Sequence, residues 1–221
     1  ADAIFVFGQN PGTNHPRMMN ALRKSARNGC KIVTFNNLKE VALERFASPQ
    51  DPIELLTPSA TQISHQYHTP ILGGDFAVVR GMVKSLLEIH VRSPEFSVIN
   101  SSFINDHCEG FSDYQAEVEQ TSWQQIEQQS GLTKQAIEQA ASIYLSAKNV
   151  ICTWAMGITQ HKHSVATIQE IVNLQLITAN IGRKGAGLCP VRGHSNVQGN
   201  RTVGINEKPP AAFIDSLNRV F

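Results

Sequence analysis

The first 35 residues carry the pattern of one β-α-β unit, and no other stretch constrains the fold as strongly. An uninterrupted apolar run, AIFVF, at residues 3–7 is typical of a strand that is buried on both faces of a parallel sheet. A polar turn and a helical stripe follow, and the stripe ends at Gly29. A second apolar run, KIVTF, occupies residues 31–35. The sequence therefore predicts two parallel strands joined by a right-handed crossover.

The turn at residues 8–14 lies where a strand ends and a helix begins, a place at which free N–H groups and the helix dipole attract anions. Its spacing is G-x-N-P-G and not G-x-G-x-x-G, so the nicotinamide fingerprint is absent. Asn36 and Asn37 follow the second strand, where a dinucleotide fold usually carries an acid for the ribose. These amides could bond a ribose or base, or simply cap a turn.

A second strand, turn and helix appear near the end of the chain. Residues 150–154 (VICTW) predict a strand, AMGITQ a turn, and residues 162–177 a helix. Gly157 and Gln160 therefore occupy the same kind of position as residues 8–14. Two such turns in one parallel sheet can face one ligand across a topological switch point.

The middle of the chain predicts a third strand and a helical insertion. IELL at residues 53–56 resembles a strand, and residues 73–90 form an amphipathic helix with Asp75 as its cap. A capping box at Thr121 and a second cap at Thr133 start two further helices, which we expect to pack on the sheet.

Composition excludes several classes of function. Lys and Arg total 19 against 18 Asp and Glu, so no global field draws the chain to nucleic acid or to an anionic membrane surface. The four cysteines form no C-x-x-C pair, and the H-x-x-H at His65 and His68 lacks a third ligand, which favours solvated loop histidines over a metal site. No apolar run has the length of a membrane span, and no signal peptide is visible. We expect a reducing, cytoplasmic setting.

Residues 185–204 are rich in glycine, arginine and amides, and they follow neither helical nor strand periodicity. Arg192 and Arg201 could hold phosphate or carboxylate oxygens. The stretch predicts a long functional loop that contacts a large, polar, anionic ligand.

Three motifs, in order, carry a family resemblance. They are G-x-N-P-x-x-x-H-P at residues 8–16, W-x-M-G-x-T-Q at 154–160, and N-I-G-x-x-G-A-G-x-x-P-V-R-G-x-x-N-V-Q-G at 180–199. Together they resemble the molybdopterin oxidoreductases, and among these the formate dehydrogenase alpha-subunit type. The resemblance covers nearly the whole chain and matches the middle of a longer protein. The chain also starts abruptly, without Met, so we expect a segment of such a protein, inactive when isolated.

The resemblance implies an α/β fold with a Rossmann-like parallel sheet, helices on both faces and a helical insertion. Residues 1–194 would bind molybdopterin guanine dinucleotide carrying molybdenum or tungsten, and residues 195–221 would start a return into a neighbouring domain. By motif position, the residues implied to contact this cofactor are Gly8, Asn10, Asn14, Asn36, Gly73, Asp75, Met156, Gly157 and Gln160.

The resemblance also assigns the chemistry. Arg192 matches the family's active-site arginine, which orients a small substrate for two-electron redox, and His194 stands where the formate dehydrogenases carry glutamine. His194 could accept a proton or alter substrate choice. No metal ligand is implied within this chain, and an iron–sulfur cluster and the redox partner would lie outside it. The alternatives are a structural or electron-transfer relative that has lost molybdenum, against which Arg192 argues, and a generic nucleotide-binding module.

Overall fold

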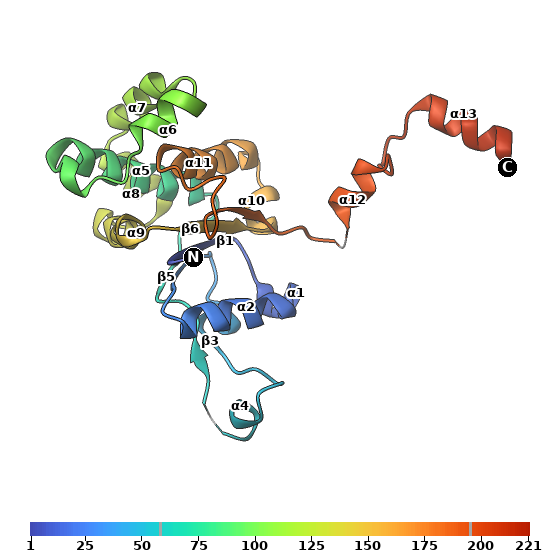
Figure 1. Ribbon diagram of the computed structural model, residues 1–221, viewed down its shortest axis with the longest axis horizontal. Coiled ribbons are helices and arrows are strands. Elements are labelled where there is room, and N and C mark those ends of the chain that lie inside the picture. Colours follow the sequence, from blue (N-terminus) through green and yellow to red (C-terminus); the bar gives the residue numbers. More distant parts are fainter. Residues whose placement is uncertain (58, 195) are drawn as a thin grey trace. The chain divides into compact units, whose positions relative to one another are not determined.

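The computed structural model describes residues 1–57, 59–194 and 196–221, which form two compact units, Ala1–Val191 and Arg192–Phe221. A five-stranded parallel sheet with the order β5-β2-β1-β6-β7 runs through the first unit (Figure 1). Its strands are β1 (Ala3–Phe7), β2 (Lys31–Phe35), β5 (Gln66–His68), β6 (Val150–Trp154) and β7 (Gly187–Pro190). The predicted β-α-β unit and the predicted strand at residues 150–154 are confirmed.

The side chains of β1 alternate between two hydrophobic cores, one on each face of the sheet. Phe5 and Phe7 belong to the larger core, and Ile4 and Val6 belong to the smaller one. All four side chains are buried. Successive side chains of a strand point to opposite faces, so a continuous apolar run requires a protein layer on each side.

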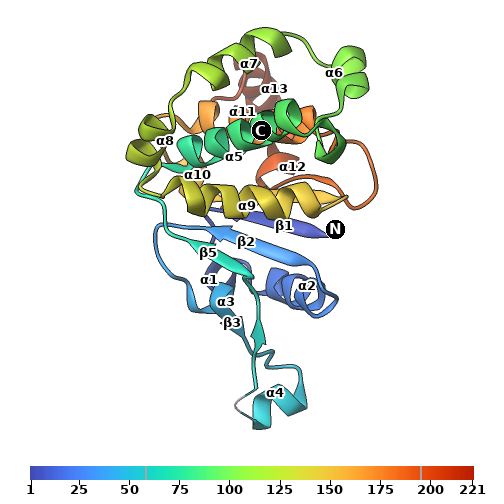
Figure 2. The same cartoon turned by 90° about the vertical axis from the view of Figure 1, so that its left-hand side faces the viewer.

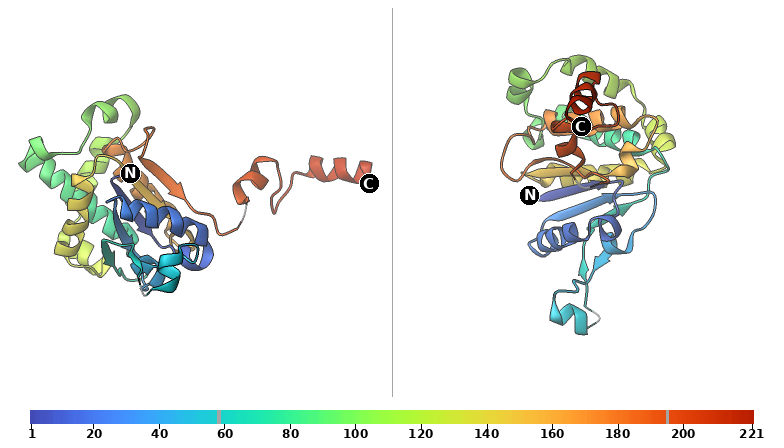
Figure 3. Two further views of the ribbon diagram at one scale, coloured as in Figure 1. Left: turned by 60° about the horizontal axis from the view of Figure 1, so that its bottom comes forward. Right: turned by 90° about the vertical axis from the view of Figure 1, so that its right-hand side faces the viewer.

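Helices supply these layers, as Figures 2 and 3 show. The smaller core lies under α1 (Pro11–Asn14), α2 (Pro16–Arg27) and α3 (Val41–Glu44). The larger core lies under the long helices α5 (Asp75–Arg92), α9 (Lys134–Ser146) and α11 (Ser164–Ile177). The shorter elements beside these are η1 (Pro94–Phe96), α6 (Ser101–His107), α7 (Phe111–Gln120), α8 (Trp123–Ser130) and α10 (Met156–Thr159). The predicted fold class is confirmed.

The third strand predicted at residues 53–56 is wrong. These residues lie in helix α4 (Pro52–Leu56), at the tip of an arm formed by the antiparallel pair β3 (Arg45–Phe46) and β4 (Thr61–Gln62). The Asp51 carboxylate caps α4 by accepting the N–H of Ile53 at 3.1 Å, and Pro52 occupies the first helical position. A four-residue apolar run cannot distinguish a strand from a short helix, and the cap decides between them.

Two predicted caps lie one residue away from the observed ones. The capping box joins Ser122 to Gln125, not Thr121 to Gln124, because the Ser122 hydroxyl accepts the Gln125 N–H at 3.2 Å. Gly74, not Asp75, is the N-cap of α5, and it supplies no side chain to the helix end. The cap predicted at Thr133 is confirmed.

Residues 185–204 are not one irregular loop. β7 pairs with β6 from Gly187 to Pro190, and α12 (Val197–Thr202) forms within the second unit. Both are too short for periodicity to reveal them, since β7 has four residues and α12 has six. Pro210 is the N-cap residue of the last helix, α13 (Ala211–Val220). The division between the two units falls after Val191. The second domain is predicted to start at position 195, which lies outside the described residues. The role predicted for residues 195–221 stays a prediction.

A buried ion pair joins α5 to α11. The Arg80 guanidinium donates to both oxygens of Glu170, at 2.6 and 3.1 Å, and to the Glu117 carboxylate at 3.0 Å. Its carbon lies 4.9 Å from the centre of the Phe76 ring, within reach of a cation–π contact. Burial raises the pKa of Glu170, and Arg80 opposes that shift. The two longest helices of this layer, α5 and α11, are therefore joined by an ion pair in which each buried charge is stabilised by the other.

We predict that Glu170→Ala lowers the free energy of unfolding by about 3 kcal/mol, because it leaves the Arg80 cation buried without its main partner. Urea denaturation measures the loss. Glu138→Ala is the matched control, since it breaks the exposed i,i+4 pair with Lys134 and should cost less than about 0.5 kcal/mol. Equal costs for the two variants would contradict the prediction.

Candidate functional site

The switch point of the sheet lies between β1 and β6. The chain passes from β1 to β2 and β5 on one side, and then returns to β6 on the other side of β1. Phe7 is in register with Phe35 and with Trp154, so three strands end in one row. The segments that follow these strands start from the same edge, which is where α/β sheets bind ligands.

The turns after β1 and β6 touch each other through glycine. The Gly157 N–H donates to the Gly8 carbonyl at 3.1 Å, and Gly8 has a φ of +54°. A methyl group added at Gly157 would lie 2.8 Å from Gly8 Cα, and one added at Gly8 would lie 2.9 Å from Gly157 C. Real Cβ atoms do not approach backbone so closely, and L side chains rarely adopt this φ. Both positions therefore require glycine for the turns to meet.

Gln9 is buried where the turns meet, and only 3% of its surface is exposed. Its Oε1 accepts a hydrogen bond from the Thr153 hydroxyl at 3.3 Å, and its backbone carbonyl accepts one from Asn36 Nδ2 at 3.3 Å. Its Nε2 has no hydrogen-bond partner among the described residues. An unsatisfied buried donor costs about 1–3 kcal/mol, so this amide lacks an acceptor that a ligand could supply.

The sequence does not reveal Gln9 as a candidate, because the G-x-N-P pattern leaves this position open. Its burial follows from the contact between the turns, which joins residues nearly 150 positions apart. No local signal in the sequence encodes that contact.

Two of the predicted amides hold the first turn in place. Asn10 caps α1 by accepting the Thr13 N–H at 3.2 Å, and it donates to Glu40 at 2.6 Å. Asn36 is buried and holds Gln9 through the hydrogen bond given above. Asn14 is exposed at the end of α1. The turn role considered for Asn36 is thus present, and the ligand contacts of all three amides stay predictions.

The residues predicted after β6 form helix α10, and the AMGITQ stretch is therefore a helical turn. Ile158 is buried and anchors it, while Met156, Gly157 and Gln160 are exposed. The Thr159 hydroxyl lies 3.3 Å from the Met156 sulfur. The anchored helix presents the Met156 thioether and the Gln160 amide at the edge of the sheet.

Gly73 and Asp75 join this group through His161, a residue that the sequence analysis does not single out. The His161 imidazole lies against Gly73 so closely that a Cβ there would overlap the ring. His161 directly follows Gln160, so the start of α5 lies beside the end of the second turn. Asp75 is half-buried; burial raises the pKa of its carboxyl to about 6, and the charge of His161 opposes that shift.

Arg192 and His194 belong to the second unit, and both are exposed. The second unit is described by itself, apart from the edge of the sheet. Their predicted catalytic roles stay predictions.

The H-x-x-H pattern, His65 and His68, does not form part of the group of residues described above. The His68 ring stacks on Phe35 with centroids 5.2 Å apart, and its Nε2 lies 3.1 Å from Gln66 Oε1. Burial lowers the pKa of His68. In the described ranges, no three His, Cys, Asp or Glu residues are grouped so that they could hold a metal ion. Within the same ranges, no helix has both the length and the apolar character needed to cross a membrane.

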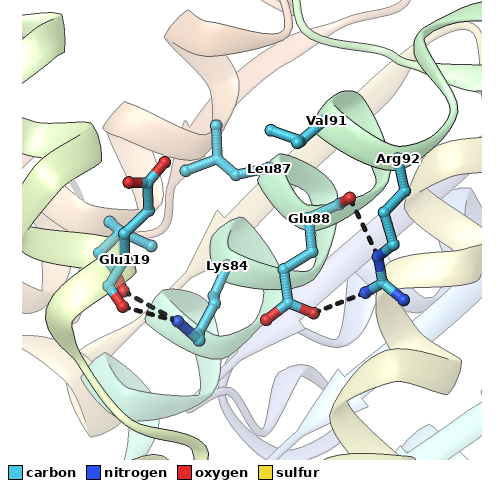
Figure 4. A pocket seen from close by; sticks show the side chains of 7 residues that line it. Lys84, Leu87, Glu88, Val91, Arg92 and Glu119 are labelled. Atoms are coloured by element: carbon cyan, nitrogen blue, oxygen red, sulfur yellow. Dashed lines mark hydrogen bonds and ion pairs between the residues drawn. The ribbon is translucent and has the colours of Figure 1, made fainter.

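A pocket of about 360 Å³ lies on the helical layer, between α5 and the end of α7 (Figure 4). Lys84 Nζ donates to the Glu119 carbonyl at 2.9 Å, and Arg92 pairs with Glu88 at 2.9 Å. The charges lining the pocket are thus bound to groups of the chain itself. The edge of the sheet, with its two glycine turns and unsatisfied amide, is the better candidate site.

The chain is similar to several known proteins. Protein YdeP of Escherichia coli O6:H1 is 45% identical over 98% of this chain, and the uncharacterized oxidoreductase Rv2900c of Mycobacterium tuberculosis is 42% identical over all of it. Formate dehydrogenase H of Escherichia coli is 30% identical over 90% of the chain. The chain covers 29%, 28% and 24% of these three proteins, respectively.

A solved structure with a similar fold is acetylene hydratase from Pelobacter acetylenicus. The TM-score is 0.67 and the sequence identity is 16%, over 83% of this chain and 22% of that protein. The similarity concerns the fold alone. The model of the molybdopterin oxidoreductase family matches residues 1–214, which include both glycine turns, and the chain therefore belongs to the molybdopterin oxidoreductase family.

Proposed function

We propose that this chain binds molybdopterin guanine dinucleotide at the carboxyl edge of its sheet, within an oxidoreductase that acts on a small substrate such as formate. The observation that carries the proposal is the pair of glycine turns at the switch point with the unsatisfied Gln9 amide between them. Membership of the family supports a molybdopterin-type cofactor.

The residues present fit a large polar, anionic group. Gly8 and Gly157 let the two turns meet at the edge, and Gln9 Nε2 needs an acceptor such as a phosphate or carbonyl oxygen. At the other end of the edge, the Asp75 carboxylate offers acceptors to a group with N–H donors, which the guanine base has. Met156 and Gln160 would contact the pterin arm between these two places. Asn10, Asn14 and Asn36 would complete the enclosure of the phosphates and ribose.

When bound, the cofactor would supply a molybdenum or tungsten centre that exchanges two electrons with the substrate. This chain's part is to hold the dinucleotide and to exclude water from it. Arg192 would orient a carboxylate substrate through a two-pronged hydrogen bond and stabilise negative charge on it. His194 would accept a proton from the substrate or shape its pocket.

Metal analysis and pterin release from the full protein test the proposal. We expect molybdenum or tungsten together with a pterin that becomes fluorescent on oxidation, and guanosine nucleotide after hydrolysis. Pure, folded protein with neither metal nor pterin would refute the enzyme proposal and favour a relative that has lost the cofactor.

We predict that Gly8→Ala lowers the amount of bound pterin at least tenfold, because the methyl group drives the two turns apart. Gly29→Ala is the matched control: Gly29 also has a positive φ, +87°, but a methyl group there meets no atom within 4 Å. The control should cost about 1 kcal/mol of stability and retain the pterin. Equal pterin content in both variants would exclude a role for the contact between the turns.

We predict that Arg192→Ala reduces turnover with formate and an artificial electron acceptor by about 100-fold or more, because charge stabilisation at the substrate is lost. Bound metal and pterin should be unchanged. Arg219→Ala is the control within the same unit, since the exposed Arg219 donates to the Ser216 hydroxyl at 3.1 Å and should be dispensable for turnover. An Arg192→Ala variant that turns over at the normal rate would rule out the assigned role.

A further inference from the structure

A carboxylate from the segment after β2 lies against the first glycine turn. Glu40 is the N-cap residue of the short helix α3 and follows soon after β2 ends at Phe35. Its Oε2 accepts a hydrogen bond from Asn10 Nδ2, in the turn after β1, at 2.6 Å. Because β1 and β2 are parallel neighbours in the sheet, both segments leave the same edge. Folding therefore brings an acid to the carboxyl edge of the sheet.

The end of β2 itself carries amides. Asn36 is buried and donates to the Gln9 carbonyl at 3.3 Å, and Asn37 is exposed. Dinucleotide folds usually place a carboxylate in this region, where it accepts hydrogen bonds from the ribose hydroxyls. Glu40 is the first acidic residue after β2 in the sequence. It is therefore the residue that could take the role of the missing acid.

Tyr67, in β5, fixes the backbone that carries Glu40. The Tyr67 hydroxyl accepts the Glu40 N–H at 2.9 Å and donates to the Leu38 carbonyl at 2.6 Å. One hydroxyl thus holds the loop between β2 and α3 at two points. The Glu40 side chain is also half-buried and bonded to Asn10. An acceptor held in this way loses little conformational entropy when it binds a ligand.

The charge of Glu40 has no basic partner within the described ranges. Lys39, its neighbour in the chain, pairs instead with Glu44 at 3.8 Å. Among the described residues, the Asn10 amide is the side chain that bonds the Glu40 carboxylate. One neutral donor uses only part of the capacity of a carboxylate, which has two oxygens and about four lone-pair sites. The remaining acceptors suit a ligand with two adjacent hydroxyl donors.

We propose that Glu40 is the ribose-binding residue of this chain: its carboxylate accepts hydrogen bonds from the 2′- and 3′-hydroxyls of the guanosine, and Asn10 and Tyr67 hold it in position. This inference rests on the proposed function and extends it, because it assigns the ribose to a residue outside the three family motifs. The same negative charge disfavours a ribose that carries a 2′-phosphate.

The experiment compares GDP with 2′,3′-dideoxy-GDP, which lacks both hydroxyls. The full protein is freed of its cofactor and titrated with each nucleotide by calorimetry, and the ratio of the two Kd values is determined. The variants are Glu40→Gln and Glu40→Ala. Glu44→Gln is the matched control, since Glu44 is a carboxylate in the adjoining helix α3 and its partner is the exposed Lys39. The pterin and guanosine content of each protein is measured before the cofactor is removed.

We expect wild-type protein to bind GDP at least about tenfold more tightly than the dideoxy nucleotide, as for hydrogen bonds to a charged acceptor. This preference should vanish in Glu40→Ala, which has no acceptor. It should be intermediate in Glu40→Gln, whose neutral oxygen accepts more weakly and can still bond Asn10. Glu44→Gln should keep the wild-type preference.

Three results would overturn the inference while pterin and guanosine in the wild-type protein still support the proposed function. They are a wild-type protein that binds neither nucleotide, a wild-type protein that binds both equally, and a preference that persists in Glu40→Ala. An equal loss of affinity for both nucleotides in Glu40→Ala falls under the last of these and would leave Glu40 a packing residue of the turn. Wild-type protein purified without pterin would instead overturn the proposed function, and this inference with it.

Discussion

The contact between Gly8 and Gly157 is the constraint on which the rest of the candidate site depends. β1 and β6 are neighbours in the sheet although 142 residues lie between Phe7 and Val150 in the chain, and their turns can meet only where neither carries a Cβ. This contact buries Gln9, holds Thr153 against it and sets the direction in which α10 leaves β6. The chemistry proposed for the edge is thus a consequence of the topology.

The side chains of β1 are buried on both faces of the sheet, and this burial explains why the topology is stable. Phe5 and Phe7 on one face and Ile4 and Val6 on the other need helices on both sides of the sheet, and only crossover connections can provide them. The first crossover brings α2 to the smaller core. The long segment between β5 and β6 contains the helices from α5 through α9, which cover the larger core. The Arg80–Glu170 pair links α5 to α11. Helices from distant parts of the chain therefore begin at the edge where the strands end.

The sequence was sufficient for the parts that depend on local pattern. Continuous apolar runs predicted β1, β2 and β6, and the motifs around Gly8 and Met156 indicated both turns and the family. The pattern failed where elements are shorter than one period. The four-residue apolar run of α4 predicted a strand, but the Asp51 cap makes these residues a helix. β7 and α12 are short elements within a glycine-rich stretch, and no pattern revealed them. Gln9 and His161 could not be predicted because each acquires its role from residues brought close only by folding.

Gln9 and Asp75 share a property that the core lacks: each is held in an environment that disfavours it. Gln9 keeps a buried amide nitrogen that has no partner among the described residues, and partial desolvation raises the pKa of the Asp75 carboxyl. Elsewhere in the first unit, buried charges are paired, as at Arg80 and Glu170, and the hydroxyl of buried Tyr144 bonds Thr178 at 2.7 Å. The helical layer thus pairs these buried polar groups, whereas the edge of the sheet leaves the buried Gln9 amide nitrogen without an acceptor among the described residues. A bound group that supplied an acceptor would remove this cost, which favours a ligand at this edge.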